Sequence, residues 1–134
     1  MSNITFNLKR EWFDLVESGL KREEYREITA YWVARLMYDG SVNKPKINTL
    51  NAQEVADLLN DGLSIAESGW KFKPFETVTN CLGYPSWDDT SRRRYFLHKG
   101  TETGYAKEGI GKELVGDRLV FVIKFEDFEP SISD

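Results

Sequence analysis

Charged residues that could take part in chemistry lie close together near the N-terminus, in the segment Gly19-Leu-Lys-Arg-Glu-Glu-Tyr-Arg26. A helix that ends at Gly19 would be followed within a few residues by a strand that carries these charged side chains. On that strand Glu24 and Arg26 share one face and can form a charge-assisted pair, while Lys21 reaches toward them from the turn. We expect these three side chains to form the polar wall of a ligand pocket. An exposed edge strand of mixed charge uses the same residue types and stays open as the alternative.

A second cluster, Arg92-Arg93-Arg94, stands directly before Tyr95 and Phe96. Arginines pair with phosphates and aromatic rings stack on bases, so this combination is typical of surfaces that bind single-stranded nucleic acid. A sheet edge protected by charge has the same composition. The sequence favours neither interpretation, and Arg94 is a candidate ligand-binding residue.

Three further features carry weaker signals. The segment from Gly100 to Gly116 holds five of the ten glycines, but Lys112 is followed by Glu113 instead of Ser or Thr. We therefore expect a loop that helps to wall a pocket, and no phosphate-binding P-loop. His98 has no partner for a metal role and is expected at the surface or at a strand edge. Cys81 is expected in the core as a small apolar residue.

Composition limits the class of protein. The chain has 134 residues, of which 40% are hydrophobic and 30% charged, which suits a single domain over residues 1–134 and excludes a disordered chain. No apolar run approaches the roughly 18 residues that a membrane span needs. The N-terminus has no visible secretory signal, so we expect a cytoplasmic location.

Charge and cysteine content bear on partners and cofactors. The net charge of −4 gives no general attraction to a polyanion, so binding of RNA would need a local patch. The acidic total favours a small ligand or single-stranded RNA over a long duplex. One cysteine and one histidine provide too few ligands for a zinc site, so we expect no metal and no cofactor.

Periodicity and capping residues predict an α+β fold. The expected elements are a strand at 4–8, a helix at 11–18, a strand at 21–28, a helix at 30–38, a polar linker at 41–48, a helix at 51–60, and strands at 75–82, 93–98 and 119–125. Gly19 is placed to end the first helix, and Asn51 with Glu54 three residues later forms a capping-box pattern. The last strand is almost continuously apolar, which indicates a position inside the sheet.

The first charged segment resembles the signature of the ASCH domain family, G-x-K-x-x-E-x-R, through Gly19, Lys21, Glu24 and Arg26. The strand and helix before the signature, the helix after it and the order of the later strands are also similar to that family. The resemblance covers most of the chain except residues 41–70, which would be a helical insertion. It implies a PUA-like fold, that is, a small mixed β-barrel with helices at its rim and a cleft where the signature residues meet.

The same resemblance implies a function. Members of the family are mostly inferred to bind RNA or nucleotides, so we expect a protein that binds RNA or a nucleotide-like small molecule. Lys21 would contact a phosphate or a carbonyl group. Glu24 would accept a hydrogen bond from a base edge or orient Lys21, and Arg26 would hold Glu24. Tyr84 or Trp87 would stack on the ligand.

A hydrolase is the first alternative. One branch of the family cleaves acetylated cytidine with a Lys and a Thr on the signature strand and a later Glu, and another member has been described as a ribonuclease. Lys21 and Glu24 would then be the catalytic residues, although Glu24 stands where that branch has its Thr. The later carboxylate is left open among Glu102, Glu108 and Glu113.

A protein-interaction adaptor is the second alternative. Trp70, Phe72 and Phe75 follow the helix at 51–60 and could leave apolar surface exposed on the insertion at 41–70. The competing interpretation is that these aromatic side chains seal the helix onto the rest of the fold.

Overall fold

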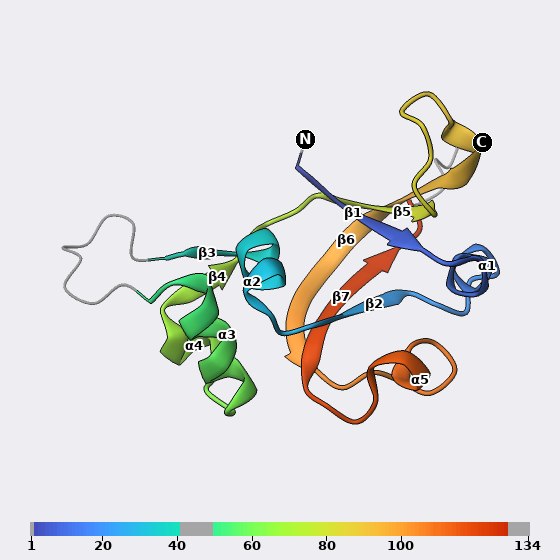
Figure 1. The fold of residues 1–134 in the computed structure, drawn as a ribbon. Coiled ribbons are helices and arrows are strands. Elements are labelled where there is room, and N and C mark those ends of the chain that lie inside the picture. The colour runs from blue at the N-terminus through green and yellow to red at the C-terminus, as the bar shows by residue number, and fades with distance from the viewer. Residues whose placement is uncertain (1, 41–49, 129–134) are drawn as a thin grey trace, which may run out of the picture. The chain divides into compact units, whose positions relative to one another are not determined.

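A computed structural model describes residues 2–40 and 50–128 of the chain, and Figure 1 shows their helices and strands. In chain order the elements are β1 (Asn3–Leu8), α1 (Arg10–Glu17), β2 (Glu23–Glu27), α2 (Ala30–Leu36), β3 (Met37–Asp39), α3 (Ala52–Asn60), α4 (Ile65–Ser68), β4 (Trp70–Phe72), β5 (Thr77–Leu82), the 3-10 helix η1 (Thr90–Arg92), β6 (Arg93–Gly104), α5 (Lys112–Val115) and β7 (Val120–Glu126). The expected α+β class is confirmed. The linker expected at 41–48 lies outside the described residues.

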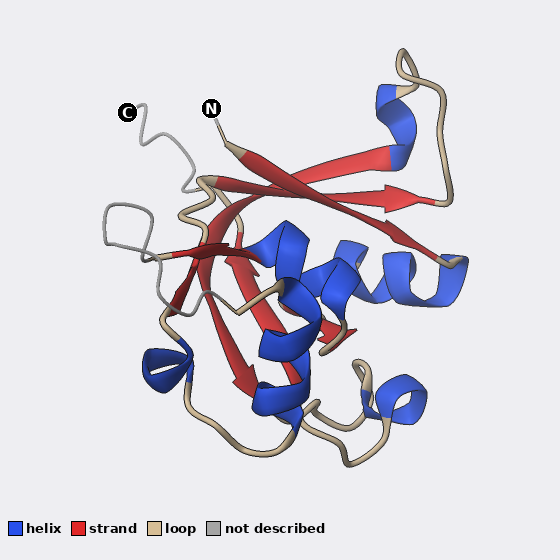
Figure 2. Cartoon of the chain, turned by 60° about the vertical axis from the view of Figure 1, so that its left-hand side comes forward, coloured by secondary structure: helices blue, strands red, loops and turns tan. Residues whose placement is uncertain are grey.

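Five strands form one mixed sheet in the order β1-β5-β6-β7-β2, and β3 pairs with β4 in a separate two-stranded sheet (the strands are labelled in Figure 1 and drawn in red in Figure 2). β1 runs parallel to β5, with Phe6 opposite Asn80. β5 runs antiparallel to β6, with Asn80 opposite Arg94. The apolar strand β7 has a neighbour on each side, as its sequence predicts.

The chain divides into two compact units. Unit 1 comprises residues 1–24, 74–100 and 123–134, and unit 2 comprises residues 25–73 and 101–122. The strands β2, β6 and β7 each continue from one unit into the other. The ASCH-like signature is therefore divided, because Lys21 and Glu24 belong to unit 1 and Arg26 belongs to unit 2.

Each unit has its own buried apolar side chains. Those of unit 1 include Ile4, Phe6, Leu8, Phe13, Val16, Val78, Phe96, Ile123 and Phe125. Those of unit 2 include Tyr25, Val33, Leu36, Met37, Val55, Leu59, Val120, Phe121 and Val122. In unit 2 the helices α2 and α3 lie side by side.

Two helix ends form as their sequences predict. After α1, Gly19 takes a φ of +88°, a conformation that residues other than glycine rarely adopt. At the start of α3, the Glu54 N–H donates to Asn51 Oδ1 at 2.9 Å, and the Asn51 N–H donates to Glu54 Oε1 at 3.4 Å. This arrangement is the expected capping box.

Two expected boundaries are wrong. The helix predicted at 30–38 ends at Leu36, because Met37 is extended and pairs with Phe72 of β4, a strand that the sequence did not predict. The strand predicted at 93–98 continues to Gly104 in the middle of the five-stranded sheet. Pairing with neighbouring strands outweighs the entropic cost of the glycines in this strand.

The aromatic residues that follow the insertion have different surroundings. The Phe72 ring meets the buried Phe121 ring edge to face at 5.9 Å, so Phe72 packs against the core of unit 2. Trp70 is half-buried beside an apolar pocket of about 600 Å³.

No helix within residues 2–40 and 50–128 is both long and apolar enough to span a membrane.

Candidate functional site

Lys21 lies in unit 1, in the turn that follows α1. The positive φ of Gly19 reverses the chain there, and the Lys21 N–H donates to the Leu15 carbonyl at 3.1 Å. This bond ties the turn to the last part of the helix. The Lys21 side chain therefore points inward from a fixed position, and only 2% of the residue is exposed.

Lys21 and Glu24 form a buried ion pair. The distance from Lys21 Nζ to Glu24 Oε1 is 3.5 Å, and the two side chains are 2% and 7% exposed. Lys21 Nζ also donates to the Glu23 carbonyl at 2.7 Å and lies 5.9 Å from the centre of the Trp12 ring. In this arrangement Glu24 orients the ammonium group, which is one of the two roles expected for it.

Arg26 lies in unit 2 at the wall of a cavity. Its guanidinium carbon is 5.1 Å from the centre of the Trp32 ring. Trp32 is held by the start of α2, where its N–H donates to the Thr29 hydroxyl at 3.3 Å. The cavity measures about 350 Å³, a size typical of small-molecule sites. Its lining residues are Tyr25, Arg26, Glu27, Thr29, Trp32, Leu114 and Val115.

The glycine-rich segment forms part of the wall of this cavity, as expected. Leu114 and Val115 come from α5 within that segment. Gly111 packs directly against the buried ring of Tyr25, whose hydroxyl accepts a hydrogen bond from the Lys107 N–H at 3.2 Å. The glycine-rich segment therefore also supports the cavity wall by packing against Tyr25, one of the lining residues.

The cavity lining combines the cation of Arg26, the carboxylate of Glu27, the rings of Tyr25 and Trp32 and two apolar side chains. Leu114 is 63% exposed, so its side chain is accessible beside the cavity. The Glu27 carboxylate accepts a hydrogen bond from Arg118 at 3.2 Å, so this acidic group of the lining is paired with a basic side chain. A guanidinium beside an indole suits a ligand that carries both an anionic group and a flat ring.

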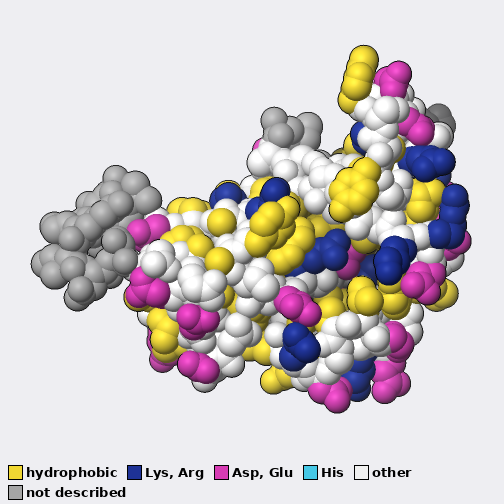
Figure 3. All heavy atoms as spheres, viewed as in Figure 1, with side chains coloured by type: hydrophobic (Ala, Val, Ile, Leu, Met, Phe, Trp, Pro, Cys, Tyr) yellow, Lys and Arg dark blue, Asp and Glu magenta, His cyan; other side chains and the backbone are white. Residues whose placement is uncertain are grey.

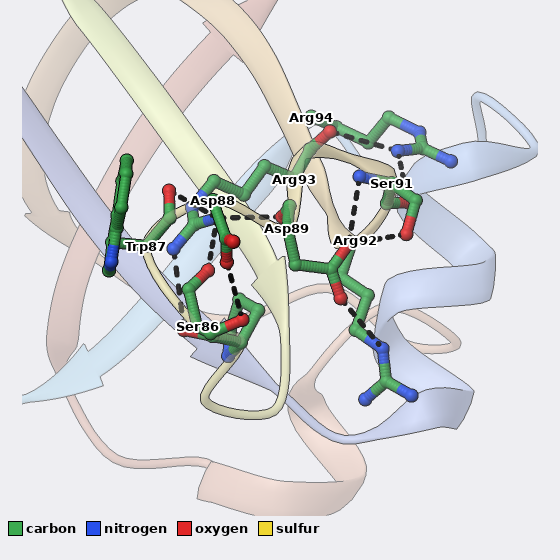
Figure 4. A network of polar contacts seen from close by, with 9 residues as sticks. Ser86, Trp87, Asp88, Asp89, Ser91, Arg92, Arg93 and Arg94 are labelled. Carbon is green, nitrogen blue, oxygen red and sulfur yellow. Dashed lines mark hydrogen bonds and ion pairs between the residues drawn. The ribbon is translucent and has the colours of Figure 1, made fainter.

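Tyr84 and Trp87 lie in unit 1, in the loop between β5 and β6, and each is 89% exposed. Figure 4 shows how Arg93 organises this loop from within. Its guanidinium donates to the carbonyls of Asp89 at 2.6 Å and Ser86 at 2.9 Å, with a longer bond to that of Trp87 at 3.5 Å. The loop therefore presents its aromatic side chains from a backbone fixed by several hydrogen bonds.

Side-chain bonds inside the loop add to this order (Figure 4). Asp89 Oδ1 accepts from the Ser91 N–H at 3.1 Å and from the Ser91 hydroxyl at 2.5 Å. The hydrogen bond from the Ser91 hydroxyl is the largest influence that lowers the pKa of the Asp89 carboxyl. Arg92 forms an ion pair with Asp89 at 3.6 Å, and its side chain is 53% exposed.

Arg94 is already engaged by an acidic partner. It donates to both carboxylate oxygens of Glu17, at 2.7 and 2.9 Å, and lies over the Phe13 ring at 5.3 Å. This hydrogen bonding lowers the pKa of the Glu17 carboxyl. A ligand that binds Arg94 must therefore compete with Glu17.

The remaining candidate residues are Cys81, His98 and Glu113, and each has contacts within the fold. Cys81 is buried, as expected, and burial raises the pKa of its thiol. His98 does not lie at a sheet edge, because β6 is an interior strand, and its ring is partly exposed beside Phe75. His98 Nδ1 is 3.0 Å from the Phe75 carbonyl, and burial lowers the pKa of the imidazole. Glu113 accepts hydrogen bonds from the Gly109 N–H, at 2.8 and 3.1 Å.

Several lining residues were not singled out from the sequence. Thr29 and Trp32 follow the signature in the pattern of a capped helix start, which is the signal that could have identified them. Leu114 and Val115 had no such signal, because they come from a segment far along the chain. Asn80 is not part of this lining and is fully buried in β5, as is the neighbouring polar residue Thr79.

Comparisons with known proteins add no assignment, since no protein-family model, curated protein or solved structure matches this chain. Among the residues whose positions are described, no group of three or more His, Cys, Asp and Glu side chains is arranged to hold a metal ion.

Proposed function

We propose that this protein binds RNA or a nucleotide-like small molecule, and that the cavity beside Arg26 takes part of that ligand. The observation that carries the proposal is the Arg26 guanidinium lying 5.1 Å from the Trp32 ring at the wall of a cavity of about 350 Å³. A nucleotide carries an anionic phosphate and a flat base, the two groups that such a wall recognises.

Each side of the cavity has a part in this proposal. Arg26 donates hydrogen bonds to a phosphate oxygen, and Trp32 offers a ring for stacking. Leu114 and Val115 cover the apolar faces of the base or the ribose. The Thr29 hydroxyl accepts a hydrogen bond from the backbone N–H of Trp32 and so fixes the backbone from which the ring extends.

Unit 1 carries its own candidate contacts for RNA, which we propose separately from the cavity of unit 2. Lys21 is oriented by Glu24 and only 2% of its side chain is exposed, so in this proposal the pair supports the fold of unit 1, and exposed residues make the contacts with the ligand. Tyr84 and Trp87 stack on unpaired bases, at little cost in loop entropy because Arg93 already holds the backbone. Arg94 reaches a phosphate by leaving Glu17.

The charge distribution supports a small ligand or a single strand. Figure 3 shows basic and acidic side chains interspersed over the face that it presents, and the net charge of the chain is −4. A long duplex needs an extended positive surface to offset its phosphates. Single-stranded RNA and free nucleotides depend more on stacking, which exposed aromatic side chains provide.

The proposal includes membership of the ASCH family and a PUA-like fold. The signature residues support this part of the proposal, since Lys21 lies just before β2 and Glu24 and Arg26 lie within it. In the chain, α1 precedes β2 and α2 follows it. The five-stranded mixed sheet is compatible with such a fold.

Calorimetric titration of Arg26→Met with adenosine 5′-monophosphate and with a short single-stranded RNA tests the proposal. We expect the wild-type protein to bind, and the variant to bind roughly ten- to a hundredfold more weakly, because a charged hydrogen bond to phosphate is lost. Arg35→Met is the matched control, since Arg35 also stacks on a ring of α2, that of Tyr31 at 4.2 Å, but does not line the cavity. Wild-type protein that binds neither probe, or a folded Arg26→Met protein that binds like wild type, would contradict the proposal.

A further inference from the structure

Glu27 brings an accessible carboxylate to the cavity of unit 2. It is the last residue of β2 and lines the cavity together with Arg26. Its side chain is 53% exposed, so a ligand reaches the carboxylate without any displacement of the fold. Among the described residues that line this cavity, no other is acidic. A carboxylate repels a phosphate, so Glu27 suits a different group of the ligand, one that donates hydrogen bonds.

Arg118 holds the Glu27 carboxylate by one of its oxygens. The Arg118 guanidinium donates to Glu27 Oε1 at 3.2 Å, and Arg118 belongs to the same unit. Its side chain is 62% exposed, so this ion pair is in contact with water. A carboxylate offers about four lone-pair positions on two oxygens. The Glu27 carboxylate can therefore accept two further hydrogen bonds from a ligand while Arg118 stays in place.

The two charged lining residues suit groups at opposite ends of one ligand. Arg26 and Glu27 are consecutive residues of a strand, and such side chains point to opposite faces. β2 is the edge strand of the sheet, so a cavity beside its end can be lined by both of them. The ring of Trp32, 5.1 Å from the Arg26 guanidinium, lies in the same lining. The cavity thus offers a cation, a stacking surface and a separate acceptor.

We infer that Glu27 makes this cavity selective for guanine, by accepting hydrogen bonds from the base edge while Arg26 holds the phosphate. The inference rests on the proposed function, because it takes the cavity to bind a nucleotide. Glu27 is then the residue that determines which base is bound, and Arg118 positions its carboxylate.

The chemistry of the bases selects guanine. A carboxylate only accepts hydrogen bonds, so it pairs best with an edge that has two donors side by side. Guanine has such an edge, formed by N1–H and the N2 amino group. Adenine, cytosine and uracil each place a donor next to an acceptor on the corresponding edge, and that acceptor would face a carboxylate oxygen. Hydrogen bonds to a charged group are stronger than neutral ones, so this difference is large enough to separate the bases.

Calorimetric titration of the wild-type protein with three nucleotides tests the selectivity without any substitution. We expect guanosine 5′-monophosphate to bind roughly tenfold or more tightly than adenosine 5′-monophosphate. Inosine 5′-monophosphate keeps N1–H but lacks the N2 amino group, so its affinity is expected to lie between the other two.

Glu27→Gln is the variant that identifies the residue responsible. The carboxamide has an acceptor next to a donor, which no longer matches guanine but matches the N6 amino group and N1 of adenine. We expect the affinity for guanosine monophosphate to fall roughly ten- to a hundredfold and that for adenosine monophosphate to rise, so that the preference reverses. Because Glu27 is half-exposed, the variant is expected to melt like wild type.

Glu126→Gln is the matched control. Glu126 also pairs with a basic side chain at 3.2 Å, that of Lys99, and is 47% exposed, but it does not line the cavity. This variant is expected to keep the wild-type preference. The inference is overturned, while the proposed function stands, if wild type binds adenosine monophosphate as tightly as guanosine or inosine monophosphate, or if Glu27→Gln leaves their ratio unchanged. If wild type binds no nucleotide at all, the proposed function fails and the inference fails with it.

Discussion

Lys21→Met is expected to lower the free energy of unfolding by about 3–5 kcal/mol. The substitution removes the ammonium group that lies 3.5 Å from the Glu24 carboxylate and leaves that carboxylate in the interior, where its side chain is 7% exposed. A buried charge that loses its partner keeps its desolvation cost and loses the attraction that offset it. Urea-induced unfolding of the wild-type and variant proteins measures the difference.

Two further variants identify the cause of this loss. Adding Glu24→Gln to Lys21→Met should recover part of the stability, because neither charge of the pair is then left without the other. Lys99→Met is the surface control, since Lys99 pairs with Glu126 at 3.2 Å with about half of each side chain exposed. That control is expected to cost about 0–1 kcal/mol. A Lys21→Met protein that unfolds like the control would show that the Glu24 carboxylate is not desolvated.

Gly111→Ala is expected to cost about 1–3 kcal/mol or more, the cost of overpacking a core. A Cβ atom at this position would lie 2.6 Å from Cε2 of Tyr25 and closer still to Cδ2. The ring cannot move aside easily, because it belongs to a buried cluster with Val115 and Val120, and its hydroxyl bonds to the Lys107 N–H. Thermal unfolding measures the loss of stability.

Gly109→Ala is the matched control in the same loop. Gly109 also has a positive φ, +83°, but a Cβ atom added there would have no neighbouring atom within 4 Å, so only backbone strain of about 1–2 kcal/mol is expected. The nucleotide affinity should also fall more in Gly111→Ala than in Gly109→Ala, because Leu114 and Val115 line the cavity next to Gly111. Equal melting temperatures for the two variants would contradict the close packing of Gly111 on Tyr25.

Local sequence patterns predicted the elements whose causes are local. The turn at Gly19, the capping box at Asn51 and the apolar strand β7 depend on a few neighbouring residues, and all three are present in the structure. The end of α2 could not be predicted in the same way, because Met37 leaves the helix to pair with Phe72, which is distant in sequence.

The candidate site could also be predicted only in part from the sequence. The sequence predicted that Lys21, Glu24 and Arg26 form the polar wall of one pocket. In the structure Lys21 and Glu24 form a buried pair in unit 1, and Arg26 lines a cavity in unit 2. The three consecutive arginines look alike in sequence, yet Arg93 holds the loop backbone while Arg94 binds Glu17. The role of each arginine depends on the acceptors that the fold brings near it. The spacing of residues in the sequence does not contain that information.

The most direct test of the proposed binding is an NMR titration of the indole N–H groups of the four tryptophans with adenosine 5′-monophosphate. The Trp32 signal reports on the cavity beside Arg26, the Trp87 signal on the exposed loop, and the Trp70 signal on an apolar pocket outside the proposed site. The proposal predicts a saturable shift of the Trp32 signal and an unchanged Trp70 signal. A Trp32 signal that stays in place throughout the titration, or a shift confined to Trp70, would contradict it.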